Sequence, residues 1–422
     1  MQAVLGIFVL LGIGWLLSMN RSAIRPRIVI AALLTQVAIG AIVLFIPWGR
    51  VVLQWLADAV NKILSYGNKG TEFLFGGLVS GKMFEVFGDV GFVFAFRVLP
   101  AIIYMTALIA VLYHLGVMRI LIGAIGTLFQ RIIGVSRVES FSAVTTIFLG
   151  QSEMPAVVKP FVMKLSGPEL FCIMSSGMAS VAGSVLAGYA GLGVKIEYLL
   201  AASFMAIPGG LLFAKLICPG TTEPPIEVKD LSFDEKRAEN AIEAAASGAS
   251  IGLKIAFGVG AMLIAFIGLI ALLNGMFAGI GSLFGVKTSL ESALGFVFAP
   301  LAWVIGVPWT DAVFAGNLIG QKMILNEFVA YVGLSPYLKD AAAVSAAGLT
   351  PIAPITAVIL SFALCGFANF SSIAILAGGF GSVATPEVRS MVARYGLRVV
   401  AAGTLSNLMS AALAGLFFSL AG

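Results

Sequence analysis

Long apolar segments follow one another along almost the whole chain, separated by short polar or basic stretches. A helix needs about 20 apolar residues to cross the hydrocarbon core of a bilayer. Seven segments are predicted to span a membrane: Ala3 to Leu17, Ile28 to Trp48, Phe92 to Leu115, Leu170 to Ala190, Tyr198 to Leu216, Ile255 to Leu273 and Val399 to Leu420. The first is short, but no basic n-region precedes it, so it is predicted to be a retained helix rather than a signal peptide.

Two further apolar stretches are interrupted by polar residues at membrane depth. Glu139 to Ser166 contains GQSEMP at Gly150 to Pro155, and Pro308 to Leu334 contains LNEF at Leu325 to Phe328. A polar break in the hydrocarbon region is tolerated only where it faces protein or water. Both stretches are therefore predicted to be re-entrant hairpins.

Each predicted hairpin precedes an apolar helix that is itself interrupted, at Ser180 to Gly183 and at Gly366 to Ser372. Glu153 and Glu327 take matching places in the two copies, 174 residues apart. Because an odd number of spans separates the copies, the first hairpin enters from the cytoplasm and the second from outside. Such inverted repeats with discontinuous helices are typical of secondary transporters.

Basic residues set the predicted orientation. The positive-inside rule places three clusters in the cytoplasm if the N-terminus is outside: Arg21, Arg25 and Arg27; Arg119, Arg131 and Arg137; and Arg389, Arg394 and Arg398. Both termini are then periplasmic or extracellular. The loop from Cys218 to Ser250 carries more acids than bases and gives this orientation no support, although Phe233 to Ala246 has the charge spacing of a solvated helix. The mixed segment Arg50 to Asp89 suits helices in the interface or at a subunit contact.

The chain is accordingly divided into six parts. They are N-terminal spans and interfacial helices, mainly scaffold (1–138), the first hairpin and broken helix (139–216), a cytoplasmic polar linker (217–250), a scaffold span with a connecting helix (251–307), the second hairpin and broken helix (308–385) and the last span (386–422).

Composition agrees with a membrane protein. Of 422 residues, 60% are apolar and 11% are charged, against about 25% charged in an average soluble protein. The formal charge of +5 comes with Arg residues beside apolar spans, which is typical of topology signals and not of nucleic-acid binding. Cys172, Cys218 and Cys365 lie in or beside apolar segments and are predicted to be small core residues, because an odd number cannot form a complete disulfide framework.

Glu153 and Glu327 are the first candidates for chemistry. A carboxylate at membrane depth costs roughly 3 kcal/mol on insertion scales, so its presence needs a reason. Ligand binding is one reason. The alternative is a structural carboxylate that caps a hairpin backbone or pairs with Lys159 or Lys322.

Polar neighbours of the two acids favour a ligand with a heterocycle and vicinal hydroxyls. Beside Glu153, Gln151 and Ser152 supply an amide and a hydroxyl that can read the edge of a base. The second break offers amide, carboxylate and hydroxyl groups that suit vicinal hydroxyls: Asn326, Glu327, Asn369, Ser371 and Ser372. Asn369 and the serines are also compatible with a role in helix packing.

Other residues are weaker candidates. His114 lies at the end of a span, and Arg97 lies inside one, where snorkelling or pairing is the ordinary role. The sequence has no Walker motif, nucleophile elbow or His/Cys metal spacing, so transport is expected to be driven by an ion gradient or to be passive. A transporter for another small polar solute and an intramembrane enzyme with two acids are the alternatives. Against them, the acids would repel anions, and no nucleophile or metal partner is visible.

Three motifs on the predicted breaks resemble the concentrative nucleoside transporter family: GQSE at Gly150 to Glu153, NEFVAY at Asn326 to Tyr331 and GFANFSSI at Gly366 to Ile373. The resemblance covers nearly the whole chain, and its length and count of about eight spans are similar to the bacterial members. It implies an elevator-type homotrimer with scaffold and transport domains in the bacterial inner membrane. It further implies a nucleoside symporter that is not an enzyme, with a sodium ion or a proton as coupling ion and no organic cofactor.

The resemblance also implies site residues. The nucleobase contacts map to Gln151, Ser152, Glu153 and Val185, and the ribose contacts to Glu327, Asn369 and Ser372, with Phe367 beside the site. The sodium ligands map to Thr146, Leu149, Ser180 and Val181. Sodium-coupled members have Asn at the place of Thr146, and proton-coupled bacterial members have a small residue there. Both ions stay open, and the hydroxyls of Thr146 and Ser180 favour sodium.

Overall fold

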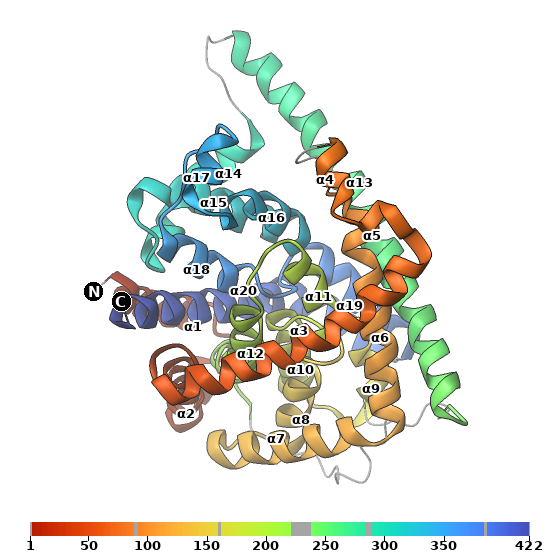
Figure 1. The fold of residues 1–422 in the computed structure, drawn as a ribbon. Helices are drawn as coiled ribbons and strands as arrows, with labels where there is room; N and C mark the ends of the chain where they lie inside the picture. The colour runs from red at the N-terminus through yellow and green to blue at the C-terminus, as the bar shows by residue number, and fades with distance from the viewer. Residues whose placement is uncertain are drawn as a thin grey trace.

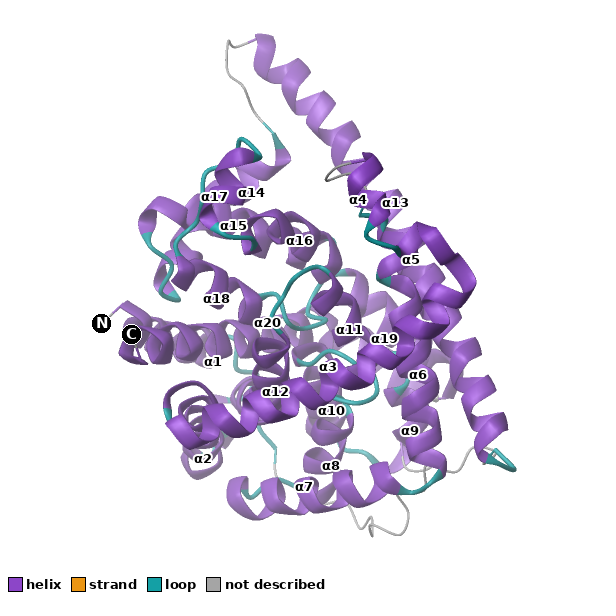
Figure 2. Ribbon diagram, viewed as in Figure 1, coloured by secondary structure: helices purple, strands orange, loops and turns teal. Residues whose placement is uncertain are grey.

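The computed structural model describes residues 2–87, 92–158, 162–220, 238–283, 289–383 and 386–421. Those residues form helices joined by loops and turns, and no strand occurs among them (Figure 2). The predicted all-α class with several apolar helices is therefore confirmed.

The N-terminal part begins with helices that cross or wrap the bundle. Their bounds are α1 (Gln2–Leu16), α2 (Pro26–Gly40), α3 (Pro47–Phe75), α4 (Lys82–Phe87), α5 (Phe94–Arg97), α6 (Leu99–His114) and α7 (Val117–Ile133). The 29-residue α3 runs across the front of the molecule in Figure 1 and exposes Val51, Trp55 and Phe73. An exposed apolar face of this kind suits the interfacial or subunit-contact role expected for this segment.

Two copies of a hairpin followed by a broken helix make up most of the remainder. The first copy contains α8 (Arg137–Thr145), α9 (Met154–Val158), α10 (Gly167–Ala179) and α11 (Gly183–Gly191), and α12 (Ile196–Ile217) follows it. The long α13 (Ala241–Leu283), α14 (Leu290–Val304) and then the second copy follow: α15 (Trp309–Ile324), α16 (Glu327–Leu334), α17 (Ala341–Ala346), α18 (Pro354–Ala363) and α19 (Ser371–Val383). The last helix is α20 (Pro386–Ala421).

The breaks fall where polar residues interrupt the apolar pattern. α10 ends at Ala179 and α11 begins at Gly183, and α18 ends at Ala363 while α19 begins at Ser371. In Figure 1, α8 lies near one end of the molecule, and α15 and α16 lie near the opposite end. The first helices of the two hairpins therefore lie at opposite ends of the molecule, which is compatible with the inverted arrangement, and that arrangement stays a prediction.

Burial separates inner helices from outer ones. In the most apolar stretch of each long helix, 89% of the residues are buried within the chain in α10 with α11, in α12 and in α20. The buried share is only 22% in α2 with its extension, and 17% in α5 with α6 and in α13. These inner helices form the centre of the molecule, next to the helix breaks. The outer helices expose apolar side chains such as Leu34, Phe257 and Ile264, which suits contact with lipid or with another subunit.

The number of spans is less definite than the sequence suggests. Among the described residues, six helices are long and apolar enough to cross a membrane, or seven if the bent pair of α14 and α15 counts as one span. The chain bends by 116° between the two helices of that pair. α1 has only 15 residues, and each piece of the second broken helix is short, so the expected count of about eight stays a prediction.

The linker differs from its expected form. Helix α13 begins at Ala241 and continues for 43 residues, so the end of the acidic segment and the expected span from Ile255 belong to one helix. Residues 238–240 precede the helix as a bend. The predicted helix from Phe233 to Ala246 is therefore confirmed for residues 241–246, which belong to α13, and wrong for residues 238–240, which are not helical. Residues 233–237 lie outside the described part of the chain.

A buried polar cluster joins the starts of α8 and α10. Ser136 and Glu139 form one capping box, and Ser166 and Glu169 form a second. The Ser136 hydroxyl donates to the Glu169 carboxylate at 3.1 Å, and the Lys215 ammonium pairs with Glu139. Each capping box satisfies backbone N–H groups that a helix start leaves unpaired. The cluster thereby fixes the base of the first hairpin against the first broken helix.

Candidate functional site

A cavity of about 200 Å³ lies where the two hairpin tips and the two helix breaks meet. The first copy lines it with Gly150, Ser152, Glu153, Ala182 and Val185, and the second copy with Asn326, Glu327, Phe328, Phe367, Asn369, Ser371 and Ile375. Six of the eight predicted substrate residues therefore share one cavity, although they come from four separate elements of the chain. The remaining two, Gln151 and Ser372, are not among the lining residues.

Asn326 begins the second helix of the second hairpin, directly after the hairpin tip. This residue is extended, and its Oδ1 atom accepts a hydrogen bond from the Val329 backbone N–H at 2.9 Å, so it is the N-cap of α16. An Asn at the N-cap satisfies a backbone N–H group that the start of the helix would otherwise leave unpaired, and Glu327 is then the first helical residue. Glu327 is held against the cavity, although only 4% of its surface is exposed. A carboxylate there is favoured by the positive end of the helix.

Two side chains hold the Glu327 carboxylate in place. The Tyr189 hydroxyl donates to its Oε1 atom at 3.0 Å, and the Asn369 amide donates to its Oε2 atom at 3.3 Å. The pairing with Lys322 considered from the sequence is not a direct hydrogen bond, because the Lys322 ammonium donates to Ala363 O and to Asn407 Oδ1. Lys159, the partner considered for Glu153, lies outside the described residues.

Gln151 and Ser372 connect the two halves directly. The Gln151 amide donates to the Ser372 hydroxyl at 2.6 Å, and both residues are buried. The Ser372 hydroxyl donates in turn to Phe367 O at 2.6 Å, while its backbone N–H donates to Asn369 Oδ1 at 2.8 Å. These contacts fix the second helix break against the first hairpin, immediately behind the cavity wall.

Three polar atoms around the site have no hydrogen-bond partner although they are buried. They are Gln151 Oε1, Glu153 Oε2 and Asn326 Nδ2, two acceptors and one donor. Glu153 is otherwise bonded by the Ser152 side chain and by backbone groups. Buried polar groups are normally satisfied, so orphan atoms at a cavity indicate positions that a polar ligand would complete.

The expected ion ligands lie close together beside the first tip. The Ser180 hydroxyl donates to Thr146 O at 3.1 Å and to Ser176 O at 3.0 Å, and the Thr146 hydroxyl donates to Ala143 O at 2.8 Å. Val181 is fully buried in the adjoining break, and Leu149 lies in the turn after Thr146. Carbonyl and hydroxyl oxygens of this kind are the ligands that hard cations prefer, so these residues fit a small monovalent ion. Among the described residues, no group of three His, Cys, Asp or Glu side chains could hold another metal.

Helix α13 supplies a wall that sequence reasoning missed. Its contributions are Ile255, Gly258, Val259 and Met262, all without polar side-chain groups. Nothing distinguished these positions from ordinary lipid-facing residues of a span. The polar side chains around the cavity therefore all come from the repeats, which also contribute Phe328 and Phe367, whereas the wall from α13 has no polar side chain.

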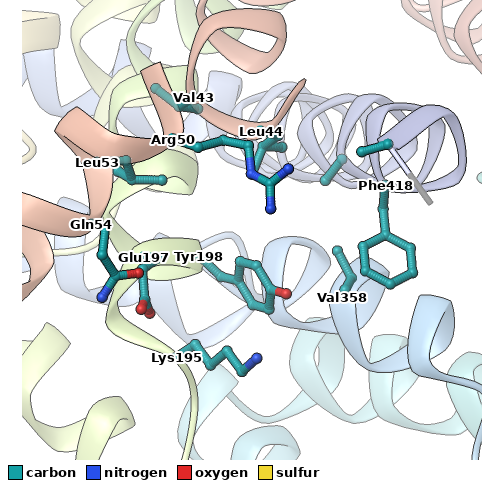
Figure 3. A pocket seen from close by; sticks show the side chains of 12 residues that line it. Val43, Leu44, Arg50, Leu53, Gln54, Lys195, Glu197, Tyr198, Val358 and Phe418 are labelled. Carbon is teal, nitrogen blue, oxygen red and sulfur yellow. The ribbon is translucent and has the colours of Figure 1, made fainter. Parts of the chain in front are cut away.

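The weaker candidates lie elsewhere. Arg97 donates to Ser80 O at 2.8 Å, and His114 ends α6. The three cysteines are free and buried, as predicted. A second cavity, of about 330 Å³, lies between α3, α12 and α20 (Figure 3). Figure 3 shows Arg50 and Tyr198 directed into it, and it contains none of the predicted substrate or ion residues.

Comparison with known proteins identifies relatives over the full length. Family models match residues 5–78 ("Na+ dependent nucleoside transporter N-terminus"), 95–195 ("Nucleoside recognition") and 198–415 ("Na+ dependent nucleoside transporter C-terminus"). The putative nucleoside permease NupX of Escherichia coli is 54% identical over 422 residues, which cover 100% of this chain and 99% of that protein. The nucleoside permease NupC of Helicobacter pylori is 46% identical, with 99% and 98% covered.

Solved structures agree with the fold. The inward-facing, substrate-bound structure of CNTnw has a TM-score of 0.94 and 52% identity, and the match covers 100% of this chain and 98% of that one. A variant of CNTnw in an outward-facing state gives a TM-score of 0.93 with the same identity and coverage. Full-length relatives at this identity, the family models and the motifs at both hairpin tips lead to one conclusion: the chain belongs to the concentrative nucleoside transporter family.

Proposed function

We propose that this protein is a secondary active symporter that imports nucleosides of the uridine, cytidine and adenosine class. The observation that carries the proposal is the set of orphan polar atoms, Gln151 Oε1, Glu153 Oε2 and Asn326 Nδ2, beside a cavity built from both repeats. The two acceptors on the first repeat and the donor on the second match a ligand that both donates and accepts, as a nucleoside does with its base edge and its ribose hydroxyls. The relatives named above are permeases, which supports transport rather than catalysis.

The two repeats divide the ligand between them. Gln151, Ser152, Glu153 and Val185 form the nucleobase side of the site, with Phe367 beside it. Ser152, Glu153 and Val185 line the cavity, and Gln151 lies behind its wall with an unbonded Oε1 atom that the base would complete. Glu327 and Asn369 bind the ribose hydroxyls, because each Glu327 oxygen has a lone pair beyond the one that Tyr189 or Asn369 uses. Ser372 acts through Gln151, which it holds by a 2.6 Å hydrogen bond.

The coupling ion binds at Thr146, Leu149, Ser180 and Val181 if it is sodium. The family models that match most of the chain are described as Na+ dependent, which supports this choice. The hydrogen bond between Ser180 and Thr146 already joins the first hairpin to its partner helix, so an ion there would organise the nucleobase side of the site. Proton coupling is the alternative, with Glu153 as the carrier.

The protein works as a homotrimer in the bacterial inner membrane, with both termini periplasmic and an elevator movement of the hairpin domain. Solved inward-facing and outward-facing structures of a 52% identical relative support a movement between two states. The exposed apolar faces of α3 and α13 support contacts with lipid and with neighbouring subunits.

Uptake of radiolabelled uridine into proteoliposomes tests the proposal. Sodium and proton gradients are imposed separately, with choline replacing sodium at constant ionic strength. We expect accumulation above the external concentration under one of the two gradients. Equal uridine levels with and without both gradients would refute coupling, and no saturable uridine uptake at all would refute nucleoside transport.

A further inference from the structure

Lys322 places a positive charge deep inside the second repeat. Its side chain is on α15 and is only 2% exposed. The ammonium donates to the backbone carbonyl of Ala363 at 2.8 Å and to Asn407 Oδ1 at 2.7 Å. Both acceptors are neutral oxygens. An ammonium bound by uncharged oxygen atoms occupies the kind of environment that a free monovalent cation would take.

Those oxygens belong to the helix breaks. Ala363 is the last residue of α18, so its carbonyl is one of the four that a helix end leaves without an intrahelical partner. Asn407 on α20 donates its amide to Ala179 O, the last carbonyl of α10, at 2.6 Å and to Cys365 O at 2.9 Å. The Asn407 side chain therefore bridges both breaks, and Lys322 stabilises the negative end of α18.

Position 322 can be compared with the matching position in the first repeat. The shift of 174 residues that brings Glu153 onto Glu327 brings Phe148 onto Lys322. Phe148 lies within the segment from Thr146 to Leu149 that holds the proposed ion ligands of the first hairpin. In the first repeat the Ser180 hydroxyl of the break donates to Thr146 O of the hairpin. In the second repeat the direction is reversed, because the Lys322 ammonium of the hairpin donates to Ala363 O at the end of α18.

Charge balance supports the same reading. Glu327 lies five residues after Lys322, is buried, and begins the next helix of the hairpin, α16. An unbalanced carboxylate at this depth is costly, and a nearby cation reduces that cost. In the first repeat a mobile ion would reduce the cost of burying the Glu153 carboxylate, whereas in the second repeat the positive charge is part of the chain.

We propose that the Lys322 ammonium is a tethered cation: it fills, in the second repeat, the site equivalent to the coupling-ion site of the first. This inference rests on the proposed function, since it takes the first repeat to bind a free ion. Two consequences follow. The second repeat binds no free ion in the native protein, and a side chain that is shortened at position 322 leaves a vacant site for a small cation.

Chemical rescue tests the inference in the full-length, detergent-solubilised protein. Uridine affinity is measured by calorimetry at fixed pH and at the sodium concentration that half-saturates the wild type, while choline is exchanged for ethylammonium. Lys322→Ala removes the ammonium and leaves space. Lys322→Gln is the matched control, because its amide fills the space and still donates hydrogen bonds without charge.

We expect Lys322→Ala to bind uridine roughly tenfold or more weakly in choline, since a buried charged partner has been removed. Ethylammonium should restore its affinity to within about threefold of the wild type. The wild type should not respond to ethylammonium, and Lys322→Gln should be weakened without rescue. A purely structural lysine that only donates hydrogen bonds would leave Lys322→Gln with the affinity of the wild type.

Several outcomes overturn the inference. They are wild-type affinity of Lys322→Ala in choline, wild-type affinity of Lys322→Gln, and an equal response of all three proteins to ethylammonium. If Lys322→Ala does not fold, the affinity of Lys322→Gln still decides between charge and hydrogen bonding. Failure of the wild type itself to bind uridine would instead refute the proposed nucleoside transport.

Discussion

Replacing Glu327 with Gln removes one charge from the cavity wall and leaves the shape of the side chain nearly unchanged. The Tyr189 hydroxyl can still donate to the remaining carbonyl oxygen, as it does to Oε1 at 3.0 Å. On the other side, the Asn369 amide, now 3.3 Å from Oε2, would face the new amide group unless one of the two side chains turns. Any ribose hydroxyl that donates to the carboxylate would lose a charged acceptor.

These contacts set the size of the effect. A hydrogen bond to a charged group contributes about 1.5–3 kcal/mol, because the alternative is a buried polar group without its partner. Loss of one such bond to the nucleoside corresponds to a decrease in uridine affinity of roughly 10- to 100-fold. Cytidine and adenosine should lose affinity to the same extent, because all three share the ribose.

Calorimetric titration of uridine into the purified protein measures this change, with size-exclusion chromatography as a check on the trimer. Glu291→Gln is the matched control. Its carboxylate also accepts a hydrogen bond from an Asn amide, that of Asn274 at 2.9 Å, but it lies outside the cavity. An unchanged uridine affinity in a folded Glu327→Gln protein, or an equal loss in Glu291→Gln, would show that Glu327 does not bind the ribose.

Three further changes test other walls of the site. Gln151→Ala should alter the ranking of uridine, cytidine and adenosine in competition binding, and a loss that is equal for all three would argue against contact with the base. Thr146→Asn should create or strengthen sodium dependence of uridine affinity in calorimetry against choline, since linkage makes each ligand raise the affinity of the other by the same factor. No change would show that ion choice is determined elsewhere. Gly258→Leu should lower uridine uptake roughly tenfold or more, because the position lines the cavity with open space beside it, and normal uptake would show that α13 does not border the bound nucleoside.

Polar interruptions of apolar runs were the most informative signal in the sequence. The tip around Glu153 and the tip around Glu327 both appear as breaks between short helices, because an unpaired backbone at that depth requires polar or protein surroundings. The first break is shorter than expected, since Met154 and Pro155 already belong to α9. A proline is tolerated in the first helical turn, where its missing N–H removes no hydrogen bond.

Other features required three dimensions. The sequence suggests only Glu327 as a partner for Lys322, because that acid is close along the chain, whereas the ammonium reaches the end of α18 and Asn407, 85 residues away. The residues with which α13 lines the cavity cannot be distinguished, by composition, from the lipid-facing residues of the same helix. The two capping boxes could have been found, since Ser136 with Glu139 and Ser166 with Glu169 have the spacing of that motif, but the pairing of Glu139 with Lys215 depends on how α8 and α12 pack.

The apolar character of the α13 wall bears on the energy barrier of transport. Every side chain that can hydrogen-bond around the cavity comes from the hairpins and the broken helices, while Ile255, Gly258, Val259 and Met262 offer only dispersion contact. In the proposed elevator movement, a ligand held by the polar side chains of the repeats would keep its hydrogen bonds while the repeats move along α13. Dispersion contacts are individually weak, about 0.1–0.2 kcal/mol per atom pair, and they re-form after each small step. In the proposed movement, α13 would therefore present an apolar surface along which the bound nucleoside is displaced without losing its hydrogen bonds.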